Sequence, residues 1–135
     1  MGRILLAEDD DNVRAFVARG LEIGGHEVVA VEDGGLAAEA LDAEGGRFDL
    51  LLSDIRMPVM DGIALALHTG STWPGLTIVL MTGFADQRER TFGLESLVYD
   101  VLAKPFSLAA LVEKVEDALA GRPVELVSLA QRAAG

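Results

Sequence analysis

The chain has 135 residues. Half are apolar, none is cysteine, and 22 acidic side chains outnumber 11 basic ones, for a formal net charge of -11. This composition predicts one domain with a sizeable core and excludes a disordered chain, a disulfide framework and a thiolate metal site. The negative charge argues against direct nucleic-acid binding and is compatible with a basic partner or a bound cation. No apolar run approaches the roughly 20 residues of a membrane-spanning helix, so we expect a cytoplasmic protein without a membrane partner.

Apolar runs of strand length alternate along the chain with segments of helical spacing. Strands are expected at 4–7, 28–31, 50–52, 76–81 and 98–102. Helices are expected at about 12–23, 36–43, 61–68, 83–94 and 107–119. Asp11 or Asn12 is expected to cap the first helix, Gly70 to break the third, and Ser107 to cap the fifth.

Five βα units with short connections predict a parallel sheet covered by helices on both faces. Residues 1–121 are expected to form this domain, because Gly121-Arg122-Pro123 marks a boundary. The remaining residues, 122–135, are expected to form a tail that is a short extra helix or a packed or frayed end.

Polar residues follow the predicted strands at the points where these end. Right-handed crossovers bring all the carboxyl ends to one edge of the sheet, where open α/β sheets bind ligands. This edge is expected to collect Glu8, Asp9, Asp54, Thr82 and Lys104. Three carboxylates in one cleft repel one another and need a cation, and oxygen ligands with room for water suit Mg²⁺. Such a set can support phosphoryl transfer, with Asp54 as the nucleophile and Lys104 neutralising charge.

Four motifs carry a resemblance to a known family over about residues 3–120. They are Ile4-Leu5-Leu6-Ala7-Glu8-Asp9-Asp10, Ser53-Asp54-Ile55-Arg56-Met57-Pro58-Val59-Met60-Asp61-Gly62, Met81-Thr82-Gly83 and Leu102-Ala103-Lys104-Pro105-Phe106. In this order and spacing the chain resembles the receiver domain of two-component response regulators. The resemblance implies a flavodoxin-like (CheY-like) fold, a doubly wound five-stranded parallel sheet with five helices.

The resemblance also implies roles for the residues at the sheet edge. Asp54 is the expected phosphoacceptor, and the expected Mg²⁺ ligands are Glu8, Asp9, Asp54 and the backbone carbonyl of Arg56. Thr82 and Lys104 are expected to contact the phosphoryl group, and the Lys104-Pro105 peptide bond is expected to be cis. The expected donor is a phosphohistidine on a sensor histidine kinase or a histidine phosphotransfer protein. The chain would then catalyse only its own phosphorylation and dephosphorylation and would not be an enzyme with an outside substrate.

Two positions depart from the family pattern, and two others are expected to tune the lifetime of the phosphorylated state. Glu8 stands where the family more often has Asp, and Val101 stands where the family has an aromatic switch residue that responds to Thr82. Tyr99, two residues before Val101, is expected on the same face of the strand and is a candidate substitute. By resemblance, Arg56 and Phe84 are expected to tune the lifetime of the phosphorylated state.

Several readings of the function stay open at this point. Ala7-Glu8-Asp9-Asp10 after the first strand, Met81-Thr82-Gly83-Phe84-Ala85 at the end of the fourth, and a chain that ends soon after the fifth helix carry a narrower resemblance. They resemble stand-alone regulators of the CpdR type, which act as adaptors for a Clp-family protease. Alternatively, the chain is the receiver module of a longer transcriptional or enzymatic regulator, or a protein-binding module that does not use phosphate. Phosphorylation is expected to change a protein-binding surface near the fourth helix, the fifth strand and the fifth helix. His26, His68 and Trp73 are interpreted as structural or surface residues.

Overall fold

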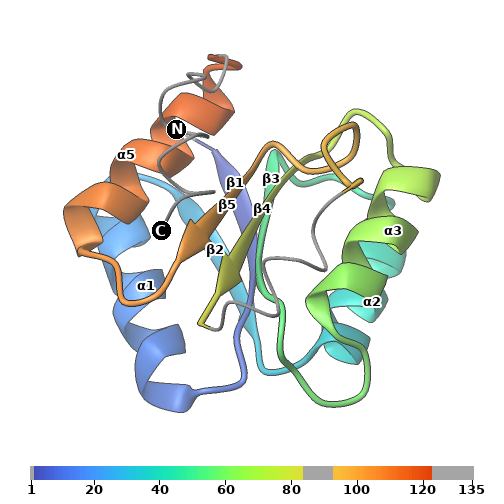
Figure 1. Ribbon diagram of the computed structural model, residues 1–135, viewed down its shortest axis with the longest axis horizontal. Coiled ribbons are helices and arrows are strands. Elements are labelled where there is room, and N and C mark those ends of the chain that lie inside the picture. The colour runs from blue at the N-terminus through green and yellow to red at the C-terminus, as the bar shows by residue number, and fades with distance from the viewer. Residues whose placement is uncertain (1, 84–92, 123–135) are drawn as a thin grey trace.

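The computed structural model describes residues 2–83 and 93–122, which form a five-stranded sheet with helices on both faces (Figure 1). The strands are β1 (Arg3–Ala7), β2 (Glu27–Val31), β3 (Leu50–Asp54), β4 (Thr77–Thr82) and β5 (Asp100–Ala103). All neighbouring strands pair in parallel, in the order β2-β1-β3-β4-β5. This doubly wound order confirms the expected flavodoxin-like sheet.

Four helices are present in residues 2–83 and 93–122. They are α1 (Asp11–Ile23), α2 (Gly34–Ala43), α3 (Gly62–Thr72) and α5 (Leu108–Leu119). The helix expected at 83–94 falls mostly on residues 84–92, which lie outside the described residues, as does the tail from residue 123. No helix in the described part of the chain is both long and apolar enough to span a membrane.

The core consists of two clusters, one on each face of the sheet. Helices α1 and α5 cover one face and helices α2 and α3 cover the other (Figure 1). Strand β3 is buried along its whole length, because its side chains alternate between the two clusters. The apolar run at 50–52 therefore marks a central strand, as its composition predicts.

The predicted cap of the fifth helix, Ser107, is confirmed, and the predicted cap of the first helix is wrong. The side chains of Asp61 and Ser107 accept backbone N–H groups of α3 and α5, respectively. Helix α1 is capped by Asp10, whose Oδ1 accepts the N–H groups of Asn12 and Val13 at 2.9 and 3.0 Å. The prediction that Asp11 or Asn12 caps this helix is wrong. Asp10 is the last residue with extended backbone, and the helix already begins at Asp11.

Gly70 does not break the third helix. Helix α3 continues through it to Thr72, so the expected end near His68 is wrong. A Cβ atom at Gly70 would lie 2.7 Å from Cδ2 of Leu97. The glycine thus permits close packing against the segment before β5. Helix propensity, which depends on local sequence, does not include this tertiary contact.

Tyr99 and Val101 lie against opposite faces of the sheet, so the prediction that they share a face is wrong. Val101 packs against the cluster under α2 and α3, whereas Tyr99 packs against the cluster under α1 and α5. Strand β5 begins only at Asp100, whose side chain pairs with Lys114 of α5 at 2.6 Å and accepts the N–H of Val101 at 2.7 Å. Within β5, Asp100 and Leu102 face the α5 side and Val101 faces the other side, as regular alternation requires; Tyr99 precedes the strand, so this alternation does not extend to it. The Tyr99 hydroxyl donates to the carbonyl of Arg122, so Tyr99 is not positioned to replace an aromatic at 101.

The two histidines and the tryptophan have structural contacts at the amino edge of the sheet. His26 is buried; its Nδ1 accepts the N–H of Gly2 at 3.0 Å, and its Nε2 lies 2.7 Å from Oε1 of Glu116. The rings of His68 and Trp73 meet edge to face at 5.9 Å. Trp73 follows α3 and precedes β4, and so lies at the edge opposite Asp54.

Candidate functional site

The carboxyl edge of the sheet brings together chain segments that are far apart in sequence. In the strand register Ala7 pairs with Ser53, Asp54 with Met81, and Thr82 with Ala103. Glu8 and Lys104 follow the ends of β1 and β5 directly, so they lie almost level with Asp54. Strand β1 connects to β2 on one side and pairs with β3 on the other, which makes this edge the topological switch point where such sheets bind ligands.

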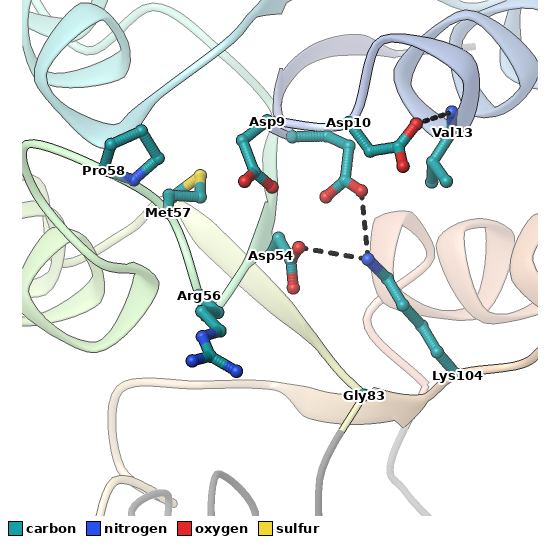
Figure 2. A pocket seen from close by; sticks show the side chains of 10 residues that line it. Asp9, Asp10, Val13, Asp54, Arg56, Met57, Pro58, Gly83 and Lys104 are labelled. Carbon is teal, nitrogen blue, oxygen red and sulfur yellow. Dashed lines mark hydrogen bonds and ion pairs between the residues drawn. The ribbon is translucent and has the colours of Figure 1, made fainter.

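Lys104 bridges two carboxylates in this crevice. Its Nζ lies 3.0 Å from Oε1 of Glu8 and 3.0 Å from Oδ2 of Asp54, and Figure 2 shows the ammonium reaching toward Asp54. Glu8 and Asp54 are buried, and Lys104 is partly buried. The expected cis Lys104-Pro105 peptide bond is confirmed directly after the lysine.

The donor set fits a hard divalent cation. Carboxylate oxygens of Glu8, Asp9 and Asp54 all lie within 4.8 Å of one another. The second oxygen of Glu8, Oε2, is buried and has no hydrogen-bond partner among the described residues. These groups line an open cleft of about 680 Å³, which leaves room for water ligands of the kind that Mg²⁺ keeps (Figure 2). Glu8, Asp9 and Asp54 are therefore the side chains that would hold Mg²⁺.

Burial and charge shift two pKa values in the cleft. Desolvation is the largest cause that raises the pKa of Glu8, the neighbouring Asp54 carboxylate adds to it, and Lys104 opposes it, with the result at about 8. Burial by itself would lower the pKa of Lys104. Its contacts with Glu8 and Asp54 outweigh that loss and hold the pKa above its ordinary value. Lys104 is therefore a permanent cation in this site.

We expect Glu8→Gln to change how stability depends on pH in metal-free protein. The folded protein holds the Glu8 proton more tightly than the unfolded chain does, because the folded pKa lies above the ordinary 4.5. The contribution of Glu8 to the unfolding free energy is therefore largest below about pH 4.5 and is lost as the pH rises toward about 8. The unfolding free energy of Glu8→Gln relative to that of wild type should therefore rise by about 2 kcal/mol from pH 5 to pH 8. This value is reduced for solvent screening in the open cleft.

Urea unfolding of wild type and Glu8→Gln at both pH values, with a chelator present, measures this difference. Glu22→Gln, at an exposed position of α1, is the control and should follow wild type. If wild type and Glu8→Gln lose or gain stability in parallel between pH 5 and pH 8, the raised pKa is contradicted.

The structure gives positions for three of the other predicted site residues and does not describe the fourth. Thr82 is buried at the end of β4, and Arg56 lines the cleft. Val101 pairs with Leu80 in the register, two rows before the pair of Thr82 and Ala103. Phe84 lies outside the described residues, so its role in tuning the lifetime of a phosphorylated state stays a prediction.

The structure adds residues that the sequence reasoning did not assign to the site. The cleft is also lined by Asp10, Val13, Met57, Pro58 and Gly83. Arg14 of α1 contacts the backbone of Glu8. The nearness of Asp10 and Met57-Pro58 to predicted site residues was a signal for them, but no local pattern distinguishes Val13 or Arg14 from other helical residues.

The fold and the crevice together define the class of protein. A flavodoxin-like sheet that presents three carboxylates and a lysine at its β1/β3 switch point is the architecture of a receiver domain. The family model of the response regulator receiver domain matches residues 4–116. The chain belongs to this family.

Individual relatives agree with this assignment. The chain is 43% identical over 119 residues to the response regulator receiver protein CpdR of Brucella abortus (strain 2308), which covers 88% of this chain and 98% of CpdR. It is 36% identical over 121 residues to the transcriptional regulatory protein PrrA of Mycobacterium tuberculosis (strain ATCC 25618 / H37Rv), which covers 89% of this chain and 51% of PrrA. The solved CheY-like receiver domain protein from Methanospirillum hungatei JF-1 superimposes with a TM-score of 0.81 at 28% identity, covering 90% and 95% of the two chains.

Proposed function

We propose that the chain is a single-domain response regulator of a phosphorelay, in which Asp54 accepts a phosphoryl group and the modification switches a protein-binding surface. One observation carries the proposal: the Asp54 carboxylate lies in an open cleft, 3.0 Å from the Lys104 ammonium and beside the carboxylates of Glu8 and Asp9. A nucleophile, a fixed cation and an acidic ligand set are the parts that phosphoryl transfer to a carboxylate needs.

The proposed step joins one oxygen of Asp54 to phosphorus. The P–N bond of a phosphohistidine breaks, its electron pair returns to the imidazole, which takes a proton from solvent, and Asp54 becomes an acyl phosphate. Bound Mg²⁺ supplies charge neutralisation for the phosphoryl oxygens. Lys104 adds a second positive charge beside Asp54, and the Thr82 hydroxyl, at the end of the adjacent strand, is the proposed hydrogen-bond donor to the modified group.

The proposed partners follow from this chemistry. The donor is a phosphohistidine on a sensor histidine kinase or a histidine phosphotransfer protein, and the chain acts on no outside substrate. The similarity to CpdR, a response regulator receiver protein, along 98% of that protein supports a single-domain regulator. We also propose a downstream protein partner, with a protease adaptor role, and a cytoplasmic location. The match to about half of PrrA supports the second candidate, the receiver module of a longer transcriptional regulator.

Phosphorylation with acetyl phosphate tests the proposal. Wild type, Asp54→Asn and Asp10→Asn are incubated with and without Mg²⁺ and followed by intact mass. Asp10→Asn is the matched control, because it lies in the same cleft and asparagine keeps the cap of α1. Wild type and Asp10→Asn should each gain one phosphoryl group only with Mg²⁺, and Asp54→Asn should gain none.

Two outcomes contradict the proposal. One is a wild-type chain that binds Mg²⁺ but gains no phosphoryl group, which would indicate a binding module that does not use phosphate. The other is modification of Asp54→Asn at the wild-type rate, which would place the acceptor elsewhere. The switch is followed separately by amide chemical shifts with beryllofluoride, which should move around Val101 on β5.

A further inference from the structure

Arg14 connects helix α1 to the segment after β1 that carries Glu8 and Asp9. Its Nη1 donates to the backbone carbonyl of Glu8 at 2.9 Å, and its Nη2 lies 2.5 Å from Oδ1 of Asp11. The backbone N–H of Arg14 donates to the carbonyl of Asp10 at 2.8 Å, within the first turn of the helix. The Arg14 side chain is only 21% exposed, although it carries a full charge.

The contact to Glu8 orients both acidic side chains. The N–H of Glu8 donates to the carbonyl of Val31 at 3.1 Å, so Glu8 is held on one side by β2 and on the other by Arg14. The peptide unit that contains the Glu8 carbonyl also contains the Asp9 N–H, and it is planar. A hydrogen bond that fixes this carbonyl therefore fixes the direction in which Asp9 leaves the strand.

The neighbouring contacts hold Arg14 rather than replace it. Asp10 caps α1 by accepting the N–H groups of Asn12 and Val13. This cap fixes the first turn of the helix, from which the Arg14 side chain extends. Asp11 is 82% exposed, so its pair with Arg14 is a surface ion pair of small energetic value. Within residues 2–83 and 93–122, the Arg14 side chain is therefore the group that holds the Glu8 carbonyl.

We propose that Arg14 is a positioning residue for the cation site: its guanidinium holds the Glu8–Asp9 peptide unit so that both carboxylates face Asp54. This inference rests on the proposed function, since it assigns a residue to the Mg²⁺ ligand set. Partners that orient metal ligands typically contribute 10- to 100-fold in metal affinity. Because Arg14 acts through a neutral carbonyl, we expect the lower end of that range.

Arg14→Met tests the proposal, because methionine keeps a long apolar stem and removes the donors. Mg²⁺ affinity is measured by calorimetry, and the rate of acetyl phosphate-dependent modification is measured as a function of Mg²⁺ concentration. We expect roughly 10-fold weaker Mg²⁺ binding and a half-saturating Mg²⁺ concentration raised by the same factor. The rate at saturating Mg²⁺ should stay within about 2-fold of wild type, because high Mg²⁺ concentration compensates for weaker binding.

Two further variants separate positioning from general stability. Arg14→Lys can still donate to the Glu8 carbonyl and should recover most of the affinity, to within about 3-fold of wild type. Arg19→Met, at an exposed position of the same helix, should leave Mg²⁺ binding unchanged. If Arg14→Met does not fold, Arg14→Gln replaces it. The glutamine amide is too short to reach the Glu8 carbonyl, so we expect the same weakening of Mg²⁺ binding.

A spectroscopic readout needs no bound metal. In metal-free protein, Arg14→Met should shift the amide resonance of Asp9 more than that of Asp54, because the hydrogen bond is made to the Glu8–Asp9 peptide. Unchanged Mg²⁺ affinity in the folded Arg14→Met variant overturns the proposal. So does a lower saturated rate with unchanged Mg²⁺ dependence, or an equal loss in Arg19→Met. Failure of wild type to become phosphorylated would contradict the proposed function and leave the Mg²⁺ binding comparison intact.

Discussion

Lys104→Met should slow phosphorylation of Asp54 by about 100-fold or more while leaving the Mg²⁺ site able to bind. The ammonium of Lys104 lies 3.0 Å from Oδ2 of Asp54, where it would neutralise charge on the oxygens of the phosphoryl group that Asp54 accepts. The same ammonium lies 3.0 Å from Oε1 of Glu8. Its removal leaves the carboxylates without this competing cation, so Mg²⁺ affinity should be unchanged or higher.

This opposite behaviour of rate and affinity distinguishes a role in transfer from a role in folding. Initial rates with acetyl phosphate at saturating Mg²⁺ and calorimetric Mg²⁺ titration give the two quantities. Lys114→Met is the matched control, because it deprives the buried Asp100 of an ion pair on α5, outside the residues that line the cleft. It should lose stability but keep the wild-type rate in the folded protein. A Lys104→Met rate within 3-fold of wild type would exclude the proposed role.

Gly62→Ala should destabilise the protein by about 1 to 3 kcal/mol and slow phosphorylation by at least about 10-fold. Gly62 is the first residue of α3, and its N–H donates to the carbonyl of Ile55 at 2.7 Å. A Cβ atom at this position would lie 2.2 Å from the carbonyl oxygen of Asp54 and 2.8 Å from Cα of Ile55. Both neighbours are backbone atoms at the end of β3, so the overlap can be relieved only by moving Asp54 or the start of the helix.

Urea unfolding measures the stability change, and intact mass with acetyl phosphate measures the rate. Gly75→Ala is the control, because a Cβ atom there meets nothing within 4 Å. Both properties of Gly75→Ala should match wild type. If Gly62→Ala is as stable and as reactive as Gly75→Ala, then close packing between α3 and the Asp54 backbone does not position the acceptor.

The alternation of strands and helices was predictable because it depends on local information. Apolar runs, turn residues and caps such as Asp61 and Ser107 lie within a few residues of the structure they determine. The members of the cleft followed from the same information, because parallel strands with right-handed crossovers can place their carboxyl ends at only one edge. Glu8, Asp9, Asp54 and Lys104 therefore meet as expected, although up to 96 residues separate them.

The sequence by itself thus determined the order of the elements, the parallel sheet and the residues at its reactive edge. Only the tertiary structure decided which face Tyr99 takes, because Tyr99 precedes β5 and its hydroxyl donates to the carbonyl of Arg122, beyond the end of α5. The same holds for Gly70, whose packing against Leu97 keeps it inside α3, and for Arg14, whose partner is a backbone carbonyl. In each case the deciding contact joins separate elements or backbone atoms, and such contacts leave no periodic pattern in the chain.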